Sequence, residues 1–72
     1  MTKAELAARL DHLDPGSTIQ VEAHTLAEMF DAGALTQEII EAIEAFALDH
    51  RCTFSYAVSA RDPPTFEKDD IF

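Results

Sequence analysis

Apolar residues recur at helical spacing near the start of the chain. In residues 2–13 they stand three or four positions apart, so one side of the segment is apolar: Leu6, Leu10 and Leu13. Thr2 and Glu5 have the spacing of a capping box, which predicts a helix beginning at Thr2. The segment Asp14-Pro15-Gly16-Ser17 follows, and its proline and glycine favour a tight turn after the helix.

The longest helical pattern covers residues 37–50. Thr36 is its candidate N-cap, and Leu35 is placed to pack against Ile40 as a hydrophobic staple. At 100° per residue, a stripe about 120° wide collects the apolar positions and one histidine: Phe46, Ile39, His50, Ile43, Ala47 and Ile40. The acidic residues fall on the opposite side: Glu38, Glu41, Glu44 and Asp49.

A shorter helix is predicted between these two. Thr25 precedes Glu28 by three residues, which is a second capping-box spacing. The helix carries Leu26, Met29 and Phe30. We expect it to stop at Asp31-Ala32-Gly33, where Gly33 readily adopts the left-handed conformation that terminates helices.

Alternation of apolar and polar residues predicts two strands, at residues 18–23 and 52–60. The first places Ile19, Val21 and Ala23 on one face. The second places on one face Cys52, Phe54, Tyr56, Val58 and Ala60. Because the strands differ in length, part of the second is expected to be an unpaired edge that admits a partner strand or a second copy of the chain. The alternative is that C-terminal residues cover this edge.

These elements predict the α+β class, as a single small domain with three helices packed on a two- or three-stranded β-sheet. We expect the compact α+β domain to span residues 1–62. Residues 63–72 follow a break at Pro63-Pro64 and are predicted to form an acidic C-terminal tail. Such a tail docks on the domain, adds a short strand or remains free.

Composition narrows the kind of partner. The 72 residues carry 14 Asp and Glu against five Lys and Arg, a formal net charge of −9. Direct binding of nucleic acid is disfavoured because phosphates require a cationic face, and an anionic membrane surface is excluded for the same reason. The single Cys52 cannot form an internal disulfide, and the N-terminus lacks the apolar core of a signal peptide, so we expect a cytoplasmic protein.

The acidic side of the 37–50 helix is the main candidate for function. Glu38, Glu41 and Glu44 are about 4.5 Å apart along the helix axis, comparable to the roughly 3.4 Å between successive phosphates of a DNA strand. The helix contains no Lys or Arg, although cations at i,i+4 would stabilise it. We therefore predict a partner-binding surface for a basic protein, comprising Glu38, Glu41, Glu44, Leu48, Asp49, Glu28 and Asp31. The alternative is a solvated helix exterior.

The last residues, Glu67-Lys68-Asp69-Asp70-Ile71-Phe72, are a second candidate. They resemble the acidic tip of bacterial single-stranded-DNA-binding proteins, which ends in aspartates followed by Ile-Pro-Phe. Here the proline is absent and a lysine interrupts the acidic run. The resemblance implies docking onto DNA-repair or replication enzymes through Asp69, Asp70, Ile71 and Phe72. The alternative is that Phe66, Ile71 and Phe72 fold back onto the domain.

No pattern indicates catalysis, a metal or a cofactor. The only soft ligands are His12, His24, His50 and Cys52, and none has zinc-site spacing. We expect Cys52 to be a small buried hydrophobe rather than a nucleophile, and no glycine-rich phosphate loop is present.

We therefore predict a non-catalytic acidic module that inhibits or modulates a nucleic-acid-handling protein by occupying its basic surface. Its size and charge are similar to those of small acidic phage-type inhibitors, including anti-CRISPR and DNA-mimic proteins. The alternative is a small structural or assembly subunit that forms a homodimer through its edge strand.

Overall fold

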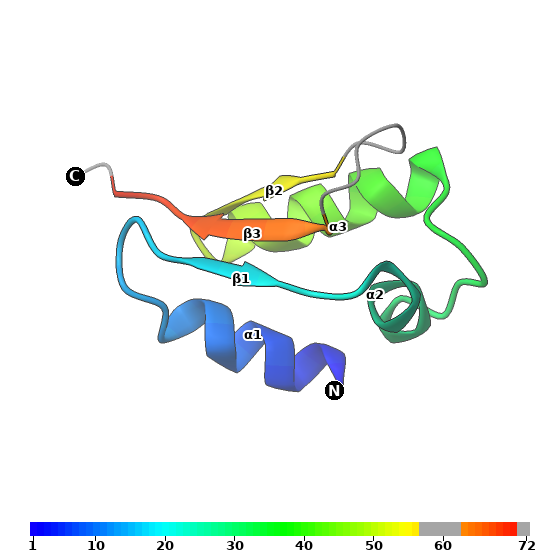
Figure 1. Ribbon diagram of the computed structural model, residues 1–72, viewed down its shortest axis with the longest axis horizontal. Helices are drawn as coiled ribbons and strands as arrows, with labels where there is room; N and C mark the ends of the chain where they lie inside the picture. The colour runs from blue at the N-terminus through cyan, green and yellow to red at the C-terminus, as the bar shows by residue number, and fades with distance from the viewer. Residues whose placement is uncertain (57–62, 71–72) are drawn as a thin grey trace.

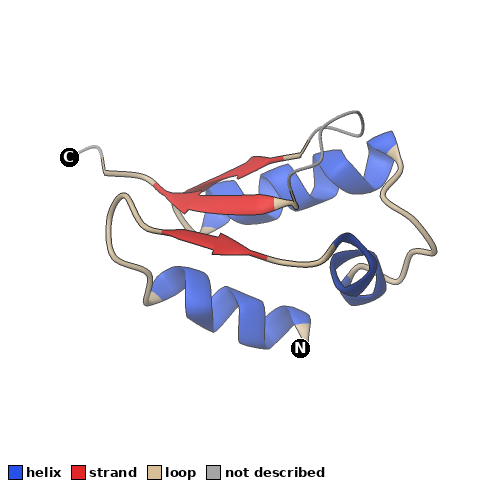
Figure 2. Cartoon of the chain, viewed as in Figure 1, coloured by secondary structure: helices blue, strands red, loops and turns tan. Residues whose placement is uncertain are grey.

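The computed structural model of the protein describes residues 1–56 and 63–70. Three helices and a three-stranded antiparallel sheet form a small α+β domain, which confirms the predicted fold class (Figure 2). In chain order the elements are α1 (Lys3–Asp11), β1 (Thr18–Gln20), α2 (Ala23–Met29), α3 (Gln37–Asp49), β2 (Cys52–Ser55) and β3 (Thr65–Lys68).

The last strand in sequence, β3, lies in the middle of the sheet (Figure 1). The strand order is β1-β3-β2, and β3 is antiparallel to both neighbours. Residues 65–68 belong to the segment that we predicted as an acidic tail outside the compact domain. Phe66 explains the difference: it pairs with Ile19 on one side and Phe54 on the other, and it is fully buried. Burying a ring of this size contributes about 1.5–3 kcal/mol, which favours docking of the whole segment.

The two faces of the sheet differ in polarity. Ile19, Phe54 and Phe66 lie in register on the face that packs against the helices. The opposite face carries polar residues, all exposed except the half-buried Thr65: Thr18, Gln20, Thr53, Ser55, Thr65 and Glu67. The predicted alternation therefore holds within β1 and β2, while residues 57–60 of the predicted second strand lie outside the described residues.

With β3 central, β1 and β2 are the edges of the sheet. The C-terminal segment covers one side of β2. Within residues 1–56 and 63–70, the other side of β2 has no strand partner. The side of β2 that faces β3 is thus covered, as the alternative expects, and the binding of a partner strand at the other side stays a prediction.

The first and third helices begin where the sequence predicts. Thr2 Oγ1 accepts a hydrogen bond from the Glu5 amide at 3.1 Å, and Thr36 Oγ1 accepts one from the Ile39 amide at 3.4 Å. These bonds satisfy amide groups that have no partner inside the helix. The turn after α1 is also as expected, since Gly16 adopts a φ of 82° and Ser17 N donates to Asp14 O at 3.0 Å.

The second helix starts earlier than predicted, but it stops at the predicted segment Asp31-Ala32-Gly33. The helix begins at Ala23 with Glu22 as its N-cap, so Thr25 lies inside it and Ala23 does not belong to a strand. It ends at Phe30, and the left-handed residue that follows is Asp31, with a φ of 54°, rather than Gly33. Asp tolerates this conformation better than most residues do, so Asp31 can take the role expected of the glycine.

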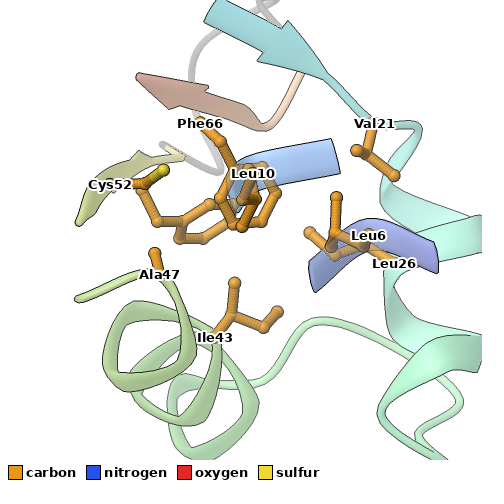
Figure 3. Close-up of a cluster of buried hydrophobic side chains, with 9 residues drawn as sticks. Leu6, Leu10, Val21, Leu26, Ile43, Ala47, Cys52 and Phe66 are labelled. Carbon is orange, nitrogen blue, oxygen red and sulfur yellow. The ribbon is translucent and has the colours of Figure 1, made fainter. Parts of the chain in front are cut away.

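The core lies between the sheet and the helices (Figure 3). Leu6 and Leu10 of α1 and Ile43 and Ala47 of α3 belong to the same buried cluster as Phe66, as the predicted apolar stripes require. The remaining buried members of the cluster are Val21, Leu26, Cys52 and Phe54. Packing the apolar stripe of α3 inward turns its acidic side to solvent.

Candidate protein-binding face

The outer side of α3 is fully exposed, which keeps its carboxylates available. We call it the acidic face and define it by its exposed residues: Gln37, Glu38, Glu41, Ala42, Glu44, Ala45, Leu48 and Asp49. The stripe on the other side is buried or half-buried. Each of the four predicted acidic residues of α3 therefore lies on one surface.

Leu48 is the apolar member of this surface, with 67% of its area exposed. It shares the acidic face with two alanines, Ala42 and Ala45, whose short side chains leave the helix backbone accessible. Large exposed leucines within a charged surface are typical of interaction sites, although a single one is also common on ordinary surfaces.

The acidic face meets no cation among the described residues. The ion pairs among the described residues join His24 to Glu28 at 3.1 Å and His50 to Asp11 at 2.7 Å. Neither involves a carboxylate of α3 that we predicted to bind a partner. Repulsion between neighbouring carboxylates on a helix costs a few tenths of a kcal/mol per pair, and a cationic partner would relieve it.

Glu28 and Asp31, the two predicted partner-binding residues outside α3, each have a local structural role. Glu28 is bound to His24 on the same helix, and Asp31 holds the left-handed turn after α2. Phe30, next to Asp31, packs edge-on against Phe46 with ring centroids 5.6 Å apart. The C-terminal end of α2 therefore lies against the second half of α3.

Two of the four predicted tail-docking residues, Asp69 and Asp70, lie among the described residues, directly after β3. Asp69 is bound within the fold: its Oδ1 accepts from Thr53 Oγ1 at 3.1 Å and its amide donates to Arg51 O at 2.9 Å. Asp70 is exposed. Ile71 and Phe72 lie outside the described residues, while Phe66 is buried as the alternative to a docking tail expected.

One end of the domain holds a polar cluster that the sequence did not reveal. Lys68 Nζ donates to Leu10 O at 2.7 Å and to His50 O at 3.2 Å, so it joins the C-terminal ends of α1 and α3. His50 Nδ1 lies 2.7 Å from Asp11 Oδ1. This contact lowers the pKa of Asp11, because a hydrogen-bonded partner favours the carboxylate. We assign the cluster to stability, since each member is bonded to a residue of another part of the fold.

Cys52, the first residue of β2, is buried, and its thiol donates to His50 O at 3.3 Å. Burial raises the pKa of the thiol, because a thiolate would lose its hydration there. The thiol contacts the backbone of His50 rather than its ring, and the ring is turned to Asp11.

Residues 1–56 and 63–70 contain no group of three or more His, Cys, Asp and Glu side chains placed to hold a metal ion. Among the helices described, none has the length and apolar character needed to cross a membrane.

The structure also places Lys3 over two aromatic rings, a contact without any signal in the sequence. Its Nζ lies 4.5 Å from the centroid of Phe30 and 5.7 Å from that of Phe46. The three residues come from three helical segments, so only the packing of these segments reveals the contact.

Comparison of the chain with protein-family models, with curated proteins and with solved structures finds no match.

Proposed function

We propose that the protein is a non-catalytic acidic module whose acidic face binds the basic surface of a nucleic-acid-handling protein and thereby inhibits or modulates it. The observation that carries the proposal is the exposure of Glu38, Glu41, Glu44 and Asp49 on a helix without Lys or Arg. A surface of one sign and a net charge of −9 attract a basic protein over long range.

The spacing of the carboxylates supports a partner that ordinarily binds phosphates. Three-residue steps along α3 advance about 4.5 Å, similar to the roughly 3.4 Å per nucleotide of a DNA strand. An Arg that contacts phosphate also forms a bidentate pair with a carboxylate. Exposed Leu48 adds an apolar contact that a purely electrostatic surface would lack.

Duplex DNA is a poor occupant for this face. DNA-binding proteins commonly place one helix in the major groove. Such a helix approaches two rows of phosphates. An α3 with four carboxylates and no cation would be repelled there, and the same charges suit a protein that competes with DNA.

The test compares two triple variants with the same change in charge. Glu38→Gln, Glu41→Gln and Glu44→Gln together neutralise the acidic face. Exposed acids on other elements provide the control triple: Asp14→Asn, Glu22→Gln and Glu67→Gln. Both variants are used with wild type for affinity capture from a host lysate at low and high salt.

The proposal expects wild type and the control triple to capture the same nucleic-acid-binding protein at low salt. The acidic-face triple should lose it, and added duplex DNA should release it, because both ligands occupy one basic surface. Equal capture by both triple variants would show that the acidic face is not the binding surface. A captured protein that DNA does not displace would also contradict the proposal.

A second candidate is a structural or assembly subunit that forms a homodimer through an edge strand. The observation in its favour is the edge position of β2, whose outer side has no strand partner within residues 1–56 and 63–70. Sedimentation separates the two candidates. A dimer that persists at high salt would favour the assembly subunit, whereas a monomer with salt-sensitive binding favours the inhibitor.

A further inference from the structure

We propose that the ring pair Phe30–Phe46 is a binding site for an arginine side chain of the partner, and that Lys3 occupies this site in the free protein. The inference rests on the proposed function, since it adds a specific contact to the same interface. It concerns rings beside the acidic face rather than the carboxylates themselves.

The geometry is that of a cation bound by two aromatic rings. Lys3 Nζ lies 4.5 Å from the Phe30 centroid and 5.7 Å from the Phe46 centroid, both within the roughly 6 Å over which a ring attracts a cation. The rings meet edge to face at 83°, so they form a corner rather than a flat stack. Both rings are half-buried, and Lys3 is exposed.

The rings hold this ammonium group without help from a carboxylate. Among the described residues no Asp or Glu forms an ion pair with Lys3, in a chain that contains 14 of them. Lys3 is also the first residue of α1, where the positive end of the helix dipole disfavours a cation. Among the described residues, the two rings therefore attract the ammonium group of Lys3, and the helix dipole opposes this attraction. A competing cation has only this contact to displace.

The site adjoins the acidic face. Asp49 follows Phe46 by three residues on α3, which makes the two neighbours on the helix surface. A basic partner lying along Glu38, Glu41 and Asp49 would bring its next cation to the rings. Arginine is the occupant that fits best, because its guanidinium is planar, weakly hydrated and stacks on aromatic faces better than the ammonium of Lys3 does.

The test uses N-acetyl-arginine methylamide as the probe and N-acetyl-citrulline methylamide as its uncharged counterpart. Both are titrated into the full chain while the ring-proton NMR signals of Phe30 and Phe46 are followed. The arginine probe should shift these signals, and the citrulline probe should not. A ring response equal for both probes would overturn the proposal, because it would not depend on charge.

Lys3→Ala removes the internal occupant and should tighten binding of the arginine probe about two- to five-fold, the contribution expected of one exposed cation–ring contact. Arg9→Ala is the matched control, since it removes the same charge from α1 without touching the rings. Equal tightening in both variants would mean that net charge alone is responsible and would overturn the proposal. Phe30→Leu in the Lys3→Ala background keeps an apolar side chain and should abolish the response of the Phe46 signals.

The acidic-face triple variant separates this inference from the proposed function. Its ring signals should still shift with the arginine probe, even where lysate capture is lost. Loss of the ring response in that variant would show that arginine binds the carboxylates instead and would overturn the site. Unaltered capture together with a preserved ring response would overturn the proposed function and leave the site standing.

Discussion

The ammonium group of Lys68 donates a 2.7 Å hydrogen bond to the main-chain carbonyl of Leu10, 58 residues earlier in the chain. A second bond, of 3.2 Å, runs from the same group to His50 O. Lys68 thus ties the central strand to the C-terminal ends of α1 and α3, where carbonyl groups lack partners inside the helices.

Replacing this lysine with an apolar residue of similar length should therefore destabilise the fold. We expect Lys68→Met to lower the free energy of unfolding by about 1–3 kcal/mol, because two carbonyls lose a charged donor in a half-buried site. Urea denaturation of the variant and wild type measures the difference. Arg9→Met, an exposed cation on α1, serves as the control and should stay within about 0.5 kcal/mol of wild type.

Alanine substitutions of Thr36 and Thr25 should have opposite effects on stability, because of the two only Thr36 is a helix N-cap. Thr36→Ala removes the side-chain bond to the Ile39 amide and should cost about 1 kcal/mol. Thr25→Ala lies inside α2 and should be neutral or slightly stabilising, because alanine has the higher helix propensity. Thermal denaturation followed by circular dichroism checks both. A larger loss at Thr25 than at Thr36 would contradict the observed start of α2.

Stability should depend on pH through Asp11. Its pKa is lowered from the ordinary value of 3.8, chiefly by the hydrogen bond with His50. A carboxyl with a lower pKa in the folded state binds fewer protons than in the unfolded state, so its contribution is present above pH 3.8. That contribution is lost as the pH falls through the folded-state pKa.

Melting temperatures of wild type and Asp11→Asn, measured from pH 7 to pH 2, test this dependence. Wild type should be the more stable protein near neutral pH, and the gap should close in strong acid. Asp14→Asn removes an exposed carboxylate of the nearby turn and should follow wild type throughout. A gap that stays constant to the lowest pH would contradict the assignment to Asp11.

Truncation distinguishes a central strand from a dispensable tail. A chain ending at residue 62 loses β3 and the buried ring of Phe66, a change that should cost more than 3 kcal/mol and prevent folding of so small a domain. A chain ending at residue 70 keeps every strand contact of the sheet and should give a folded circular dichroism spectrum. If the shorter chain folds, the strand order is wrong.

Cys52 should react slowly with thiol reagents. Burial raises its pKa, so both the thiolate fraction and the access of a reagent are reduced. With Ellman's reagent at pH 8, we expect a rate at least about ten-fold below that of the protein in urea. A fast native reaction would instead favour a Cys-dependent activity, which the buried position of this thiol argues against.

Hydrophobic periodicity predicts the acidic face but not the contacts between distant segments. Glu38, Glu41 and Glu44 were placed on the exposed side of their helix because a strong apolar stripe permits only one orientation against a core. The contact of Lys3 with Phe30 and Phe46 had no such signal, since it depends on how three segments meet. The roles of Lys68 and Asp69 were hidden for the same reason.

The sequence by itself determined the α+β class, the caps at Thr2 and Thr36, and the side of α3 that faces water. These features depend on residues a few positions apart, whose relation is set by helix and strand geometry. Only the tertiary structure decided that residues 65–68 form the middle strand and that α2 begins at Ala23. Strand order depends on which apolar side chains bury one another although they are far apart in the sequence. Burial of Phe66 between Ile19 and Phe54 contributes more free energy than is lost by bringing its acidic neighbours into the sheet.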